Sequence, residues 1–338
     1  MNRIKAVMNL AIMICLLLVN VLYGQVDVKK AGQSTMKFLN VSVAAQAAGM
    51  GDAYLNIGKG AVSMFYNPAA LTESKGKYDF FVSTTSWLAD INYYSGSLAY
   101  HTRNLGTFAF SMLFVDYGII NGTEIGEYSD VTGANFTEIG ELPNVGAYAF
   151  GIGYARQIST QFSMGGNFMY VGHQLGTHPN QTIGDQEMNK LIFNFGIKYY
   201  PGLFQSFRFG MNIRNFGTHA KYEYRAAQLP ASFSIGAAVN LLEILSADVN
   251  KESSRLTVSA QFEHPNDYTE RMHIGAEYLL SGMIFLRAGY KFNYDLESFA
   301  GGVGFLKSFG MHEIRIDYSY SQIELLDNVQ RISLSYSL

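Results

Sequence analysis

The sequence contains one cysteine, six prolines and one tryptophan among 338 residues, and only 15% of its residues are charged. The cysteine, Cys15, lies in an apolar run near the start of the chain. The remainder of the chain therefore cannot form a disulfide, supply a thiolate nucleophile or bind zinc through cysteine. An average soluble domain has about 25% charged residues. The scarcity of charge indicates secondary structure that faces something other than water.

Long apolar runs are absent beyond the first two dozen residues. No later segment approaches the roughly 18 consecutive apolar residues that indicate a membrane-spanning helix. In lipid, only helices and closed β-barrels satisfy every backbone polar group. If this chain is embedded in a membrane, it must therefore be a barrel, and its 34 glycines, 23 tyrosines and 24 phenylalanines favour that class.

Residues 1–24 are predicted to be a cleaved signal peptide. Arg3 and Lys5 give a basic start, the apolar run Ala11–Leu22 follows, and Gly24 is a small residue near the expected cleavage point. The alternative is a membrane anchor, but the run is short for a span of about 20 residues. The net charge of −3 becomes more negative when the two cations are removed. A negative chain is not expected to bind nucleic acid, which requires a basic face.

Apolar and polar residues alternate along most of the chain from about residue 78 onward. In the segment 286–292, for example, Leu286 and Tyr290 alternate with Arg287 and Lys291. A period of two places these sets on opposite faces of a strand. A soluble sandwich also alternates, but these segments approach the roughly 9–11 residues that a tilted membrane strand needs.

Tyrosines recur on the apolar faces near the segment ends, which favours an aromatic girdle at the membrane interface. The residues assigned to this girdle are Tyr78, Tyr100, Tyr117, Tyr170, Tyr199, Tyr290 and Tyr320.

The alternating segments number about 14, and an even number is what a closed antiparallel bacterial barrel requires. The predicted fold is all-β: a 14-stranded antiparallel transmembrane β-barrel over residues 78–338. The predicted strands are 78–87, 92–101, 105–116, 145–157, 161–173, 189–200, 205–214, 231–242, 255–264, 270–280, 283–293, 298–308, 311–320 and 329–338.

The links between predicted strands alternate between short and long, as in barrels with short periplasmic turns and long external loops. The link 243–254 breaks this rule, so either a strand is misplaced or a short helix lies there. The longest link, 117–144, contains five acidic residues and no Lys or Arg. We interpret it as a solvated surface loop rather than as a contact for a partner or an ion.

The segment before the barrel, residues 25–77, is rich in Ala, Gly and Met. A 14-stranded barrel has a lumen wider than its own side chains fill, since about eight strands just close around theirs. We therefore predict that this segment folds inward as a plug, because it is too apolar to remain a solvated periplasmic tail. The candidate plug residues are Gly49, Met50, Gly51, Asn67, Pro68 and Ala69, with Pro68 ending any helix near residues 66–67.

Charged residues on the polar faces of the strands are predicted to point into the lumen. An Arg or Lys on the lipid side at mid-membrane would cost about 2–4 kcal/mol. We favour a hydrogen-bonded network that fixes the plug over a polar path for a ligand. The candidate lumen residues are Arg208, Arg214, Arg287, Lys291, Arg315 and Asp317.

The run Phe38–Tyr54, which contains Gly49-Met50-Gly51, and the Asn67-Pro68-Ala69 motif resemble the N-terminus of the PorV/PorQ family of FadL-like barrels. The stretches Ile314–Tyr320 and Arg331–Ser335 resemble the last hairpin of that family.

The sequence departs from the family pattern in three places. Gly58-Lys59-Gly60 stands where acidic residues are common, Ala70 replaces a common Gly, and the chain ends in Leu338 rather than in an aromatic residue. These departures leave the family fold in place but weaken any transfer of the role of PorV itself.

The resemblance implies a bacterial outer-membrane location, contact with outer-membrane lipid, and one of two functions. PorV-like proteins take part in type IX protein secretion and bind the translocon and the C-terminal domains of cargo. FadL-like barrels carry hydrophobic small molecules past an N-terminal plug, which would place such a ligand in the lumen. The residues themselves do not decide between these functions.

Motifs for catalysis or for a cofactor are not found in the sequence. The seven histidines lack His-x-x-x-His spacing, and neither a Gly-x-Ser-x-Gly elbow nor a phosphate loop occurs. We predict a protein with no catalytic residues, no metal and no cofactor. A pair of carboxylates inside the lumen is the enzymatic alternative that the sequence leaves open.

Overall fold

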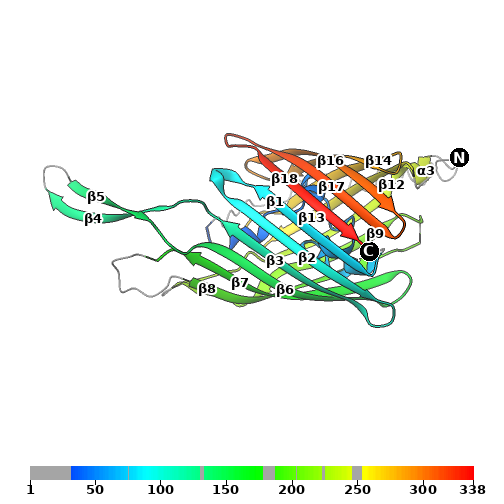
Figure 1. The fold of residues 1–338 in the computed structure, drawn as a ribbon, viewed down its shortest axis with the longest axis horizontal. Coiled ribbons are helices and arrows are strands. Elements are labelled where there is room, and N and C mark those ends of the chain that lie inside the picture. The colour runs from blue at the N-terminus through cyan, green and yellow to red at the C-terminus, as the bar shows by residue number, and fades with distance from the viewer. Residues whose placement is uncertain are drawn as a thin grey trace.

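A computed structural model describes residues 32–74, 76–129, 133–177, 187–202, 204–222, 225–245 and 253–338. Fourteen strands form one closed barrel in which each strand pairs with its neighbours in antiparallel fashion (Figure 1). The strands are β1 (Tyr78–Ser86), β2 (Asn92–Thr102), β3 (Gly106–Asp116), β6 (Val145–Gln157), β7 (Phe162–Leu175), β8 (Glu187–Tyr199), β9 (Arg208–Gly217), β12 (Ser232–Asn240), β13 (Arg255–Pro265), β14 (Arg271–Leu280), β15 (Ile284–Phe292), β16 (Glu297–Phe309), β17 (His312–Ile323) and β18 (Val329–Ser337).

The barrel closes where its first strand meets its last. β1 pairs with β18, and the backbone N–H groups of Tyr78 and Leu338 each donate to the other's carbonyl at 2.9 Å. Closure leaves no unpaired strand edge around the wall. The predicted 14-stranded antiparallel barrel is confirmed. In the described part of the chain, no helix has the length and apolar character needed to cross a membrane, and the predicted signal peptide lies outside the described residues.

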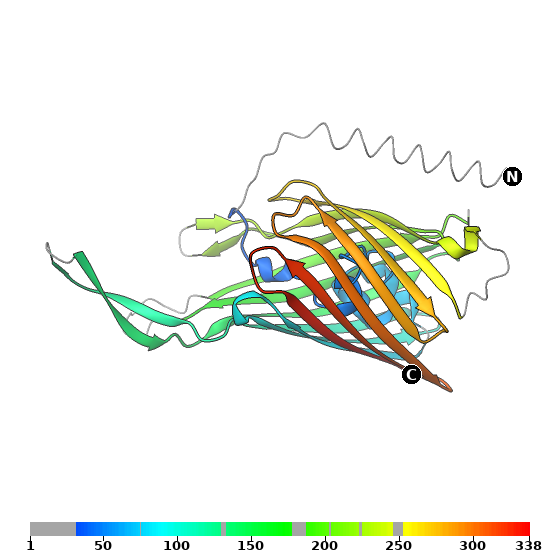
Figure 2. The ribbon, with the colours of Figure 1, turned by 90° about the horizontal axis from the view of Figure 1, so that it is seen from above.

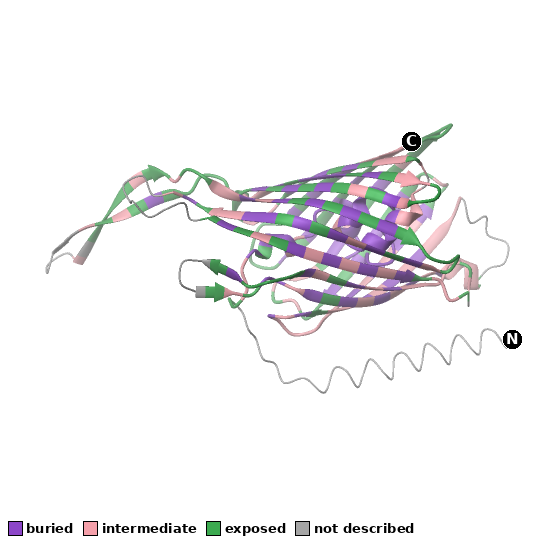
Figure 3. Cartoon of the chain, turned by 90° about the horizontal axis from the view of Figure 1, so that it is seen from below, coloured by how far each residue is buried: buried purple, intermediate pink, exposed green. Residues whose placement is uncertain are grey.

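Side chains alternate between the lumen and the outer face along each strand, as the burial colours of Figure 3 show. In β15, Arg287 and Lys291 are buried inside the barrel, whereas Leu286 and Tyr290 are exposed on its outside. The outer face is therefore apolar and the lumen is polar, which is the arrangement that lipid requires.

The girdle assignment is wrong for Tyr117. This residue follows β3 and packs against the buried core inside the barrel, with its ring 5.8 Å from that of His173. The cause is a turn directly after the strand, where Gly118 has a φ of +69° and donates to the Asp116 carboxylate at 2.9 Å. The alternation of apolar and polar residues predicts which way a side chain points only within a strand, and β3 ends at Asp116, one residue before Tyr117.

Two of the long links contain hairpins that the sequence analysis did not predict. The link after β3 holds β4 (Asn121–Ser129) and β5 (Gly133–Glu141), which project far beyond the barrel at the left of Figure 1. The link after β9 holds the shorter pair β10 (Ala220–Tyr222) and β11 (Arg225–Ala227).

A short helix, α3 (Leu241–Leu245), follows β12 at the opposite end of the barrel. Of the two alternatives for the irregular link there, the short helix is therefore correct. The flanking strands β12 and β13 begin and end within two residues of their predicted bounds.

Residues 36–74, which precede β1, lie inside the barrel, where Figure 2 shows their short helices enclosed by the strands. We call residues 36–74 the plug segment. It contains η1 (Lys37–Asn40), α2 (Ala45–Ala48), η2 (Gly60–Phe65) and η3 (Pro68–Glu73). η3 contacts β6, β7 and β8, whereas α2 contacts β16, β17 and β18. The plug segment therefore touches opposite sides of the lumen wall.

Candidate functional site: the plugged lumen

The backbone of Met50 lies directly against glycines in the lumen wall. A Cβ atom added to Gly289 would lie 2.0 Å from the Met50 carbonyl carbon, and one added to Gly275 would lie 2.3 Å from the Met50 oxygen. Gly51 has a φ of +59°, and a Cβ there would lie 2.7 Å from the Tyr290 nitrogen. Only glycine fits at such contacts. The Gly-Met-Gly motif and the glycines of β14 and β15 thus allow the backbone of the plug segment to lie directly against the backbone of the barrel wall.

Asn67 fixes the next part of the plug segment to β8. Its side-chain amide donates to the carbonyls of Leu55 and Ile197, each at 3.2 Å, and its Oδ1 accepts from the Ala69 N–H at 3.1 Å. Asn67 therefore caps η3, and Pro68 occupies the first position of that helix, where its missing N–H costs nothing. Pro68 thus begins a helix here, and the preceding η2 ends at Phe65.

Two further wall glycines make room for this Asn-Pro-Ala motif. A Cβ on Gly165 would lie 2.6 Å from the Pro68 oxygen, and one on Gly196 would lie 2.1 Å from Asn67 Oδ1. The adjacent Ala69 is fully buried. The glycines of β7 and β8 thus serve the same purpose here as those of β14 and β15 do around Met50.

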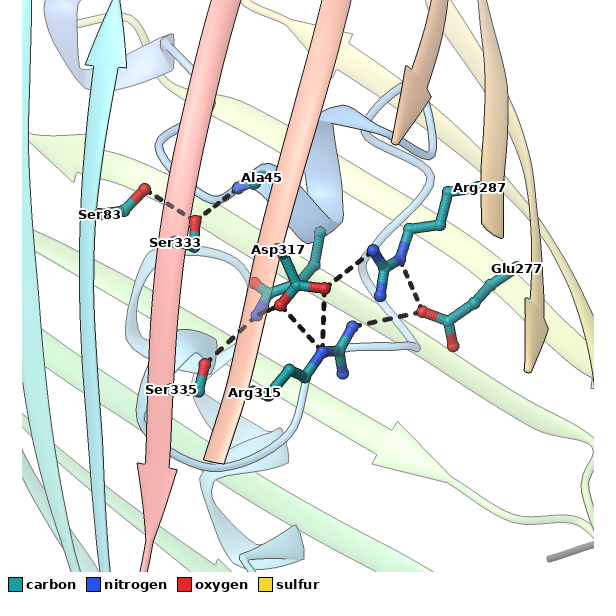
Figure 4. Close-up of polar contacts among 9 residues, drawn as sticks. Ala45, Ser83, Glu277, Arg287, Arg315, Asp317, Ser333 and Ser335 are labelled. Atoms are coloured by element: carbon teal, nitrogen blue, oxygen red, sulfur yellow. Dashed lines mark hydrogen bonds and ion pairs between the residues drawn. The ribbon is translucent and has the colours of Figure 1, made fainter. Parts of the chain in front are cut away.

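A buried charged network joins three strands on the other side of the lumen (Figure 4). Arg287 lies 2.8 Å from Glu277 and 2.9 Å from Asp317, and Arg315 lies 2.9 Å from the same aspartate and 3.5 Å from Glu277. From the plug segment, the Gln46 side-chain amide donates to Asp317 at 2.8 Å. The network is thus both part of the wall and an anchor for α2.

Lys291 forms a second link between wall and plug segment. Its ammonium lies 2.6 Å from the Asp52 carboxylate and also pairs with Glu297. Burial alone would raise the pKa of Asp52, but the adjacent Lys291 ammonium holds that pKa below its usual range. Asp52 is therefore ionised inside the lumen under ordinary conditions.

The two candidate arginines of β9 make fewer contacts. Arg214 donates to the Leu39 carbonyl of η1 at 3.1 Å. Arg208 lies on the inner face of β9 and is half-buried, and within the described residues its buried Nε has no hydrogen-bond partner. Of the six predicted lumen residues, Arg214, Lys291 and Asp317 thus bond directly to the plug segment. Arg287 and Arg315 are joined to it through Asp317, and no such link is seen for Arg208 among the described residues.

Other charged lumen residues were not singled out from the sequence. The buried Lys198 of β8 pairs with Glu73 of η3 at 2.6 Å, and Arg331 of β18 donates to the Ser42 carbonyl at 2.7 Å. Both cations occupy inward positions in the alternation of their strands. The period-two pattern that identified the six candidate lumen residues could therefore have identified these two as well. Their acidic or carbonyl partners in the plug segment carry no such periodic signal.

A cavity of about 750 Å³ lies in the lumen beside the plug segment. One part of its lining is apolar and another part is charged. The lining includes Met36, Leu113 and Met169 on the apolar part and Glu263, Arg271 and Lys291 on the charged part. Ligand cavities in proteins commonly measure about 300–1,000 Å³. In the described ranges, no group of three or more His, Cys, Asp or Glu side chains is arranged to hold a metal ion.

Comparison with protein families gives a match to the description "Type IX secretion system protein PorV" over residues 25–263. The chain belongs to the PorV family. The family membership inferred from the sequence motifs is therefore confirmed, although the last hairpin lies beyond the matched residues and its resemblance stays a prediction. No curated protein matches this PorV-family chain.

Solved structures with the same fold include two hydrocarbon transporters. The CymD monoaromatic hydrocarbon channel is 14% identical, with a TM-score of 0.55, over 88% of this chain and 97% of the channel. The toluene transporter TodX of Pseudomonas putida is 13% identical, with a TM-score of 0.55, over 87% of this chain and 96% of the transporter. At such identity the likeness establishes the fold alone: this PorV-family chain shares the closed β-barrel architecture of these transporters.

Proposed function

We propose that this chain is a non-enzymatic binding and shuttle component of type IX protein secretion. It contacts the translocon and the C-terminal domains of cargo proteins at the outer surface of the membrane. Membership of the PorV family supports the secretion role. The sequence alone favoured a solvated loop for residues 117–144. The projecting β4–β5 hairpin is the structural observation that favours the other interpretation, a contact with a partner at the surface.

The hairpin exposes a pair of large apolar side chains to solvent. Ile125 lies directly opposite Phe136 in the register of the two strands, and these residues are 73% and 67% exposed. A two-stranded ribbon is marginally stable by itself in water. Exposed apolar groups rimmed by polar residues are typical of a surface that binds a protein.

The charge of the hairpin favours a basic partner surface. Glu138 and Glu141 are exposed on β5, and Glu124 is half-buried on β4. Residues 117–144 contain no Lys or Arg, so no internal cation compensates these carboxylates. Complementary charge raises the rate and the specificity of association more than the affinity itself.

The anchored plug segment also favours a role at the surface. Its backbone contacts at Gly275 and Gly289 and its ion pairs hold it against opposite sides of the wall. Displacing it would separate the buried wall cations Lys198 and Lys291 from Glu73 and Asp52, and breaking buried ion pairs is strongly unfavourable. A polypeptide cargo is therefore expected to pass beside this barrel and not through it.

The test is a pull-down of the full-length protein from native outer membrane. The variant Ile125→Ser/Phe136→Ser should recover much less translocon and cargo than the unchanged protein. A matched control is Leu325→Ser/Leu326→Ser, which removes two exposed apolar side chains from the link after β17. Equal recovery by both variants, or recovery of only lipids and porins by the unchanged protein, would contradict the proposal.

The cavity beside the plug segment supports a second candidate function, a FadL-like channel for hydrophobic small molecules. Its volume of about 750 Å³ and its apolar part suit such a ligand, and the two structural relatives carry monoaromatic compounds by name. A deletion strain should then take up long-chain fatty acids or monoaromatics more slowly. Leu113→Trp, which fills the cavity, should not restore uptake. Normal uptake by the deletion strain would exclude this function.

A further inference from the structure

Exposed charges are distributed unequally between the two ends of the barrel. The end with the short links carries exposed cations on or next to the outer face: Lys77, Arg103, Arg156 and Lys307. The end with the long links carries the exposed acidic residues Asp90, Asp116, Glu138, Glu141, Glu324 and Asp327, which outnumber its exposed cations Lys37 and Lys221. We call the four cations the basic rim.

Within this rim, the Lys77 side chain lies beside two stacked tyrosine rings. Tyr78 and Tyr100 lie opposite each other on β1 and β2, and their rings stack at 5.1 Å. The Lys77 ammonium lies 5.6 Å from the centre of the Tyr78 ring and 5.7 Å from that of the Tyr100 ring. Cations within about 6 Å of an aromatic ring are attracted to its face. The lysine is therefore placed beside two aromatic rings at the edge of the lipid-facing surface.

The same combination of cation and aromatic residue recurs on β6, which is separated from β2 by β3. Arg156 is exposed two residues beyond Tyr154 on β6, and the Tyr154 hydroxyl donates to the Leu105 carbonyl at 2.6 Å. The Tyr154 ring packs on Phe108 at 5.2 Å. Aromatic rings of this kind lie at headgroup level in membrane barrels. The adjacent guanidinium therefore lies at the depth of lipid phosphates.

Short links of bacterial barrels face the periplasm, so the basic rim faces the leaflet that consists of phospholipids. We propose that the rim binds the phosphate groups of anionic phospholipids in the periplasmic leaflet, with Lys77, beside the stacked rings of Tyr78 and Tyr100, as the principal site. Lysine and arginine near an anionic lipid surface are attracted to it.

The experiment measures lipid binding by the full chain in detergent micelles, with native mass spectrometry as the readout. Phosphatidylglycerol and phosphatidylcholine are the two probes, because they differ in the charge of the headgroup. The unchanged protein should retain phosphatidylglycerol preferentially. The rim variant Lys77→Gln/Arg103→Gln/Arg156→Gln should lose that preference, with about a fivefold weaker affinity for each charge removed.

Three comparisons make the test specific. Lys190→Gln/Lys221→Gln removes two cations from the other end of the barrel and should leave the preference unchanged. Lys77→Arg keeps a cation at the principal site and should retain binding. Inorganic phosphate at millimolar concentration should not displace the lipid, because the aromatic residues contribute only to a membrane-bound ligand.

The proposal is overturned if both lipids bind equally to the unchanged protein or if the rim variant keeps its preference for phosphatidylglycerol. Displacement by inorganic phosphate would also overturn it, since the rim would then be a site for free anions. Lys77→Arg keeps the charge and therefore distinguishes loss of the site from loss of folding.

Discussion

The carbonyl carbon of Met50 occupies the place where a side chain on Gly289 would begin, 2.0 Å from an ideal Cβ. The plug segment is thus fitted to the wall at the level of the backbone. Gly275 on β14 and Gly302 on β16 extend this contact to the neighbouring strands, where they lie against Met50 and Gly49.

Gly289→Ala is expected to destabilise the barrel by about 1–3 kcal/mol, because the added methyl group forces Met50 away from the wall. The measurement is thermal unfolding in detergent micelles. Gly301→Ala is the matched control, since a Cβ there meets only the Arg287 carbonyl at 3.7 Å. The control should change stability by less than about 0.5 kcal/mol. Equal unfolding temperatures for the two variants would show that the close contact has no energetic consequence.

Asp317→Asn is expected to lower stability by about 3–5 kcal/mol, because the buried Arg287 and the half-buried Arg315 lose their shared carboxylate. Arg287 and Arg315 both lie 2.9 Å from that carboxylate. Denaturant unfolding measures the effect, with the exposed Asp116→Asn as control. A variant as stable as the control would mean that the network does not hold the strands together.

Asn67→Ala removes three hydrogen bonds and leaves the Leu55 and Ile197 carbonyls without that donor. We expect a loss of about 1–3 kcal/mol and faster tryptic cleavage after the exposed Lys59, because the middle of the plug segment loosens. Asn135→Ala on the projecting hairpin is the control. Unchanged cleavage at Lys59 would argue that other contacts alone hold the plug segment.

Acid is expected to weaken the attachment of the plug segment through Asp52. The pKa of this carboxyl is depressed in the folded protein by Lys291, so its stabilising contribution is complete above its ordinary pKa of about 4. The contribution is lost as the pH falls from there through the lower folded pKa. Asp52→Asn should remove this part of the pH dependence of the unfolding temperature. Identical pH profiles for the variant and the unchanged protein would rule out this linkage.

The sequence predicted the wall well because the period of two is a local property of a strand. β6 begins and ends at the predicted residues 145 and 157, and Arg287, Lys291 and Asp317 all lie inside the barrel. β9 is the least accurate strand: it was predicted as 205–214 and is Arg208–Gly217. Its pairing with β8 shifts register between Phe193 and Phe195, and such an irregularity interrupts the alternation from which bounds are read.

The sequence by itself determined, to within a few residues, which segments form the strands of the barrel wall, which face most of their side chains take, and that residues 25–77 are too apolar for water. Only the tertiary structure decided that Arg287 meets Glu277 and Asp317, that Met50 meets Gly289, and that the link after β3 is a projecting hairpin. The reason is that a strand's alternation depends on its own residues. Which residues meet depends instead on the register between strands and on where the plug segment packs, and neither is encoded in any one segment.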